Sequence, residues 1–141
     1  MENILIDTDI AVEYLRNRDK GSSELLRLLQ SHVIYISAIS EFELCLGART
    51  NRHWEDLEMV FSQLVLIPFD FGCGRISADI WKNRELAHQH LEIKDIFIAG
   101  IAIHEDLWLR TFNEKHFKGI NGLNVGGLAK MPQKGPFENA L

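Results

Sequence analysis

Short apolar runs rich in β-branched residues alternate along this chain with longer segments whose apolar positions recur at helical spacing. The short runs predict buried strands at residues 4–6, 33–36, 65–69 and 107–111, with a fifth short strand at 123–125. The helical spacing predicts helices at about 9–16, 38–49, 51–63, 76–90 and 96–103, and one more that begins at Ser22 or Ser23. Strands that alternate with helices predict an α/β fold, a three-layer α/β/α domain with a central parallel sheet of four to five strands.

The chain divides into a folded part and a tail. We expect residues 1–125 to form one domain, because a chain of 141 residues can bury a single core. Segment 126–141 contains glycines, two prolines and few apolar anchors, which predicts a loosely ordered C-terminal tail.

Composition and charge are those of a soluble globular protein, with 46% hydrophobic and 25% charged residues. The net charge of −5 argues against a surface that binds nucleic acid by charge throughout, but it permits a basic rim around an acidic pocket. The N-terminus predicts no signal or transit peptide, and the longest apolar run, 96–103, is too short to cross a bilayer. Cys45 and Cys73 fit no metal or redox spacing, so we interpret them as reduced core residues of a cytoplasmic protein.

Asp7, Thr8 and Asp9 directly follow the first predicted strand. In open α/β sheets, ligands and metals bind at the carboxyl ends of the strands, so Asp7 is the first candidate catalytic residue. Asp7 or Asp9 would equally serve as the N-cap of the following helix, and this stretch alone favours the cap.

Further polar residues fall at equivalent places. Glu43 has capping-box spacing from Ser40, yet a cap at Ser37 would put Glu43 beyond the first turn of its helix. Asp95 opens a very apolar helix, where an N-cap role is again the alternative, and Asn113 follows the fourth strand. Right-handed crossovers would bring these positions to one edge of the sheet.

Converging carboxylates need a neutralising partner. Two of them about 4 Å apart repel by about 4 kcal/mol at an effective dielectric constant near 20. Hard oxygen ligands without His or Cys favour Mg²⁺ or Mn²⁺. Such an ion is suited to the activation of water against a phosphodiester.

Four segments resemble, in order, the motifs of PIN-domain ribonucleases, and most nearly those of the VapC-type toxins of toxin–antitoxin pairs. They are residues 4–9, 36–44, 94–102 and 111–117, and the resemblance covers about residues 3–125. It implies that Asp7, Glu43 and Asp95 are catalytic and bind the metal ion. Asn113 stands where family members often carry a fourth acid, and Glu114 is its neighbour, so the number of metal ions and a substituting role of Glu114 stay open.

The resemblance also implies roles around these acids. Asp9 replaces the usual Asn of the first motif, and Thr8 and Thr111 would orient ligands by hydrogen bonds. Lys82 and Lys94 would hold the RNA backbone, with a solvated surface charge as the alternative for each. That alternative is favoured for Arg84, which could also lie near the pocket. We predict no His base, since the histidines at 88, 90, 104 and 116 form no metal pair on one helix face.

The function implied by the resemblance is a metal-dependent endoribonuclease. It would be the toxin component of a type II toxin–antitoxin system, cleaving RNA, often transfer RNA. It would form a homodimer, and a VapB-like antitoxin would lay a helical segment in a groove and block the site. Two alternatives stand beside it. Residues 7–9 also look like the nucleophile motif of haloacid-dehalogenase-type phosphatases, and the missing fourth acid favours a catalytically depleted PIN-type module that binds RNA or a partner.

Overall fold

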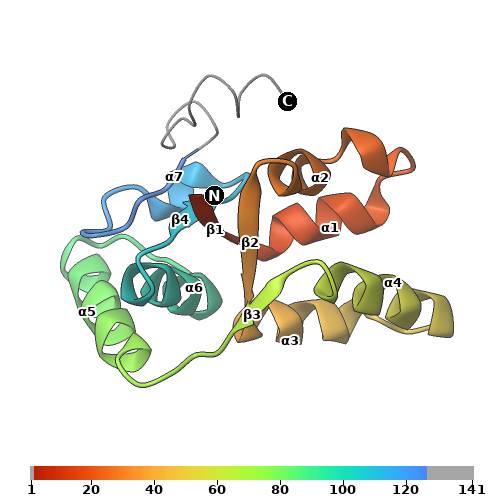
Figure 1. Ribbon diagram of the computed structural model, residues 1–141. Coiled ribbons are helices and arrows are strands. Elements are labelled where there is room, and N and C mark those ends of the chain that lie inside the picture. Colours follow the sequence, from red (N-terminus) through yellow and green to blue (C-terminus); the bar gives the residue numbers. More distant parts are fainter. Residues whose placement is uncertain (1, 127–141) are drawn as a thin grey trace.

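A central sheet of four parallel strands organises the fold in the computed structural model, which describes residues 2–126 (Figure 1). The strands are β1 (Glu2–Ile6), β2 (His32–Ser37), β3 (Val65–Ile67) and β4 (Trp108–Arg110), in the order β3-β2-β1-β4. The predicted fifth strand is reduced to an isolated bridge between Leu109 and Val125. All but the first residue of the tail predicted at 126–141 lies outside the described residues.

Helices cover both faces of the sheet, which confirms the predicted three-layer α/β/α arrangement (Figure 1). One face carries α1 (Thr8–Arg16), α2 (Glu24–Leu29), α3 (Ala38–Gly47) and α4 (Asn51–Phe61), with the short 3₁₀ turn η1 (Lys20–Ser22) between α1 and α2. The other face carries α5 (Cys73–Leu86), α6 (Ile93–His104) and α7 (Glu114–Phe117).

Strand β1 is apolar at every position from Ile4 to Ile6 because both of its faces are buried. Ile4 and Ile6 pack into the core formed with α1 to α4, whereas Leu5 packs into the core on the α5 and α6 side. Successive side chains of a strand point to opposite faces, so a strand covered on both faces needs apolar residues at every position. β3 is an edge strand and ends before Pro68, as a proline without an N–H requires.

Helix α5 differs from its predicted bounds. It begins at Cys73 and ends at Leu86, whereas the spacing predicted about 76–90. Gly72 precedes it with a φ of 93°, and a Cβ there would lie 2.6 Å from His104 Nε2, so only glycine allows this close turn. Cys73 is buried as predicted, but Cys45 is only partly buried.

Close packing of α5 against α6 fixes the position of α6. A Cβ on Gly100 would lie 2.2 Å from Ser77 Oγ and 3.2 Å from the Cys73 carbonyl oxygen. The two helices therefore approach more closely than any larger residue would permit. Since α6 leads through a short turn into β4, its N-terminus lies at the carboxyl edge of the sheet.

Candidate active site

Asp7 occupies the centre of the carboxyl edge, between the end of β1 and the start of α1. Its backbone N–H donates to the Arg110 carbonyl at 2.9 Å, which continues the pairing of β1 with β4. Its Oδ1 accepts from the Thr8 N–H at 2.8 Å, and its Oδ2 accepts from Thr111 Oγ1 at 2.8 Å. The N-cap alternative is therefore correct as local geometry, and the same bonds fix both carboxylate oxygens in a side chain that is 7% exposed.

Thr8 connects α1 to α3. Its Oγ1 donates to Glu43 Oε1 at 2.7 Å and lies 2.8 Å from Ser40 Oγ. Ser37 is the N-cap of α3 and accepts from the Ser40 N–H, so Glu43 stands beyond the first turn, as predicted. The capping-box alternative for Ser40 and Glu43 is wrong, and the Glu43 carboxylate is directed to the start of α1.

Lys94 is a partly exposed residue that contacts the acidic cluster, by which we mean Asp7, Asp9, Glu43 and Asp95. Its Nζ is 2.9 Å from Glu43 Oε2, and the Lys94 and Glu43 side chains are 43% and 23% exposed. The hydrogen bond and charge of Glu43 raise the pKa of Lys94. Lys82 is exposed on α5, and the role of both lysines toward RNA stays a prediction.

Asp95 stands in the first turn of α6, where its charge meets those of the other acids. The N-cap of α6 is Glu92, so the N-cap alternative for Asp95 is wrong. Burial first, and then the charges of Asp7, Glu92 and Glu43, raise the pKa of Asp95 to about 6. His116 Nδ1 lies 3.9 Å from Asp95 Oδ2 and partly offsets this rise.

Asp9 joins the same cluster from the first turn of α1. Its Oδ2 accepts from the Phe112 N–H at 3.1 Å, whereas its Oδ1 is buried without a hydrogen-bond partner in the described part of the chain. Burial and the charge of Asp7 raise the pKa of Asp9 to about 6. Asp9 thus holds the segment after β4 and leaves one carboxylate oxygen available.

The segment after β4 brings Thr111 into the site. Thr111 is fully buried, and its Oγ1 donates to Asp7 and accepts from the Asn113 N–H at 3.0 Å. Asn113 reaches this network through its backbone, since within residues 2–126 its exposed carboxamide has no hydrogen bond. Glu114 follows at the start of α7 and is partly buried.

The structure therefore brings together the three acids that the sequence separates widely. The pKa of Asp7 is raised as well, by burial and by the charge of Glu43, against the hydrogen bonds from Thr111 and Thr8. Sequence reasoning missed Ser40 and the proximity of His116 to Asp95. The spacing of Ser37 and Ser40 in the sequence could have indicated the role of Ser40. No sequence pattern indicated that His116 would lie near Asp95.

The donor set fits a hard divalent cation by its chemistry. Carboxylate oxygens predominate, and Asp9 Oδ1 has no hydrogen-bond partner within residues 2–126. Burial first, and then the charges of neighbouring acids, raise the pKa values of Asp7, Asp9 and Asp95, so a bound cation would relieve both causes. In this arrangement, however, no three His, Cys, Asp or Glu side chains of residues 2–126 are placed to enclose an ion. Binding would require a side chain of the cluster to move.

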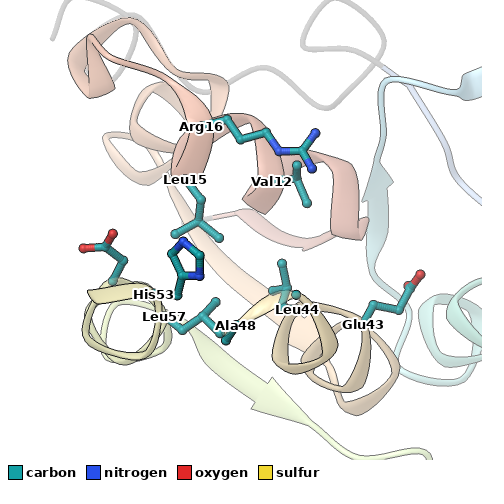
Figure 2. Close-up of a pocket in the computed structure, with 10 residues that line it drawn as sticks. Val12, Leu15, Arg16, Glu43, Leu44, Ala48, His53 and Leu57 are labelled. Carbon is teal, nitrogen blue, oxygen red and sulfur yellow. The ribbon is translucent and has the colours of Figure 1, made fainter. Parts of the chain in front are cut away.

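A groove of about 360 Å³ between α1, α3 and α4 adjoins the acidic cluster (Figure 2). Apolar side chains form much of its wall, namely Val12, Leu15, Leu44 and Leu57. Glu43 is also among the residues that line the groove, and Figure 2 shows its carboxylate pointing away from Leu44 and Leu57. Figure 2 shows Arg16 on the α1 side and His53 on the α4 side.

The chain belongs to the PIN domain family, whose sequence pattern it matches over residues 4–123. It is 32% identical over 114 residues to Ribonuclease VapC19 of Mycobacterium tuberculosis, which covers 80% of this chain and 90% of that protein. It is 30% identical over 133 residues to Ribonuclease VapC1 of Rickettsia felis, covering 86% of this chain and 93% of that protein. These matches confirm the resemblance and favour it over the haloacid-dehalogenase-type alternative.

Solved structures agree with this assignment. The crystal structure of VapBC2 from Rickettsia felis, bound to a DNA fragment from its promoter, superimposes with a TM-score of 0.79 at 26% identity. It covers 88% of this chain and 97% of that one. VapBC from Salmonella typhimurium shares the fold with a TM-score of 0.75 at 24% identity, covering 89% and 98%. None of the helices within residues 2–126 is both long and apolar enough to span a membrane.

Proposed function

We propose that this protein is a metal-dependent endoribonuclease, the toxin component of a type II toxin–antitoxin system. The observation that carries the proposal is the convergence of Asp7, Glu43 and Asp95 at the carboxyl edge of the sheet. The charge of Glu43 contributes to the raised pKa values of Asp7 and Asp95, and the charge of Asp7 contributes to that of Asp95. The relatives named Ribonuclease VapC support RNA as the substrate. We place its action in the cytoplasm, where cellular RNA is found.

Each side chain has a proposed role in cleavage. Asp7, Glu43 and Asp95 would hold Mg²⁺ or Mn²⁺, which when bound supplies a water of lowered pKa and neutralises phosphate charge. Thr8 and Thr111 orient Glu43 and Asp7 through their hydroxyl hydrogen bonds.

The residues at the rim of the cluster would position the substrate. Asp9 fixes the segment after β4 through the Phe112 N–H. Asn113 would face the RNA with its exposed carboxamide, while Glu114 is the candidate substitute for the absent fourth acid. Lys82 and Lys94 are the proposed contacts to the RNA backbone.

Digestion of total cellular RNA by the purified protein tests this function. We expect discrete cleavage products with Mg²⁺ or Mn²⁺ and none after addition of EDTA, because the acids alone cannot neutralise the attacked phosphate. Electrophoresis of the RNA is the readout, with transfer RNA as the first purified substrate. RNA that stays intact under all metal conditions, despite retained RNA binding, would favour the catalytically depleted alternative instead.

We also propose two protein partners. A helical segment of a VapB-like antitoxin would lie in the groove between α1, α3 and α4, whose wall reaches Glu43. A second copy of the chain would cover part of the exposed apolar surface, which on α3 includes Phe42 at 56% and Leu46 at 61% exposure, one turn apart. Light scattering of the purified protein should give the mass of two copies, and a monomer mass at all concentrations would contradict the dimer.

A further inference from the structure

The contact between Lys94 and Glu43 brings a positive charge to the acidic cluster. Within residues 2–126, Lys94 is the one lysine or arginine whose cationic group lies within 4 Å of a carboxylate of Asp7, Asp9, Glu43 or Asp95. It is neither buried nor remote, since its side chain is 43% exposed and belongs to the residue that precedes Asp95.

Both oxygens of Glu43 are already engaged. Oε1 accepts from Thr8 Oγ1 at 2.7 Å, and Oε2 accepts from Lys94 Nζ at 2.9 Å. A divalent cation bound to Oε2 would stand next to an ammonium group and be repelled by it. Because Thr8 is tied to α1 and Ser40, the flexible Lys94 side chain is the partner that can leave.

We infer that Lys94 is an exchangeable internal counter-cation of Glu43, displaced when a divalent ion binds. The inference rests on the metal site proposed above. Without metal, the ammonium group neutralises part of the acidic cluster. With metal, the ion takes over Glu43, and the released ammonium group, at the first turn of α6, becomes available for a phosphate of the RNA backbone. Lys94 is thus a positioning residue that couples the occupancy of the metal site to the charge presented to RNA.

Metal affinity tests the inference without reference to cleavage. Titration calorimetry of the full chain with Mn²⁺ should give a Kd for Lys94→Gln about fivefold lower than for the wild type, the upper range for a partly exposed ion pair. Lys94→Arg keeps the cation and should bind Mn²⁺ as the wild type does. Arg18→Gln removes one positive charge from the exposed turn after α1, far along the chain from the acids, and should leave the Kd unchanged.

Unfolding in EDTA supplies the second readout. Lys94→Gln should lower the stability of the metal-free protein, and this loss should vanish when Glu43 is already Gln, because the two side chains act as a pair. A merely structural lysine would lower stability without tightening Mn²⁺ binding.

The possible outcomes distinguish the role of Lys94 from the existence of the metal site. Equal or weaker Mn²⁺ binding by Lys94→Gln, with normal binding by the wild type, overturns the role of Lys94 and leaves the nuclease proposal intact. A wild type that binds no Mn²⁺ at millimolar concentration overturns the metal site itself, and the role of Lys94 with it. Tighter Mn²⁺ binding, together with a stability loss that disappears in the Glu43→Gln background, supports the exchange.

Discussion

Asp7→Asn should reduce RNA cleavage by more than about 100-fold, since even the hydrogen-bond partners of metal ligands typically contribute roughly 10–100-fold. The substitution removes a negative charge at the centre of the cluster. The amide keeps one oxygen but is a far weaker ligand for a hard divalent ion. Gel-based initial rates on a labelled RNA, with Mg²⁺ in excess, measure the effect.

The Asp7→Asn variant should still fold, so its cleavage rate can be compared directly with that of the wild type. Asn is as good an N-cap as Asp, so its oxygen can still accept from the Thr8 N–H, while its NH₂ group can donate to Thr111 Oγ1. One of several repelling charges is also removed, so the variant should unfold at the same or a higher temperature. Asp79→Asn on the exposed surface of α5 is the matched control. Cleavage by Asp7→Asn at the wild-type rate would remove Asp7 from the active site.

The metal-free protein should become more stable as the pH falls from about 7 to about 5, opposite to the usual behaviour of paired carboxylates. Burial and neighbouring charges raise the pKa values of Asp9 and Asp95 in the folded protein to about 6, from an ordinary value of 3.8 in an unfolded chain. Between these values the folded protein binds more protons than the unfolded chain, so lower pH favours folding. Above the folded-state pKa, both states are ionised and the full cost of the buried charges remains.

The expected size follows from the shifts. A shift of two pKa units corresponds to about 3 kcal/mol, which we reduce to about 1–2 kcal/mol per group because both side chains are partly exposed. Urea unfolding in EDTA at several pH values measures this gain. Asp95→Asn should stabilise the protein near neutral pH and lose that advantage near pH 5, where the wild-type carboxyl is protonated, again with Asp79→Asn as the control for net charge.

The effect of Mg²⁺ on stability tests whether the ionised acids of the cluster destabilise the metal-free protein. A cation that neutralises the ionised acids should stabilise the wild type near neutral pH, more than at about pH 5, where protons compete for the same carboxylates. If the stability of the metal-free protein falls steadily on acidification from neutral pH, the acids of the cluster are not destabilising one another, and the proposed metal site lacks its electrostatic basis.

The elements of the fold were largely readable from local patterns. The uninterrupted apolar run of β1 predicted a strand covered on both faces, and Leu5 and Ile6 do enter opposite cores. The bounds of α5 were predicted less well, because the close contact of Gly72 with His104 fixes where this helix begins, and such a contact lies outside any local pattern.

The residues of the site could be predicted from the sequence, but the contacts between them could not. Asp7, Glu43 and Asp95 each follow or adjoin a strand end, and parallel strands bring such positions to one edge. The hydrogen bond from Thr8 to Glu43, the ion pair of Lys94 with Glu43 and the approach of His116 to Asp95 depend on helix orientation and side-chain rotamers. These are set by contacts between residues far apart in the chain.

By itself, the sequence determined a parallel α/β domain with its acids at one sheet edge, because strand periodicity and crossover handedness are properties of the backbone. Only the tertiary structure decided that Asp7 caps a helix and also faces the cluster, that Asp95 does not cap, and that Lys94 turns toward Glu43. The reason is that electrostatic interactions between these groups act over a few ångströms in space. Their strength is fixed by burial and distance, which the packing of α1, α3 and α6 against the sheet establishes.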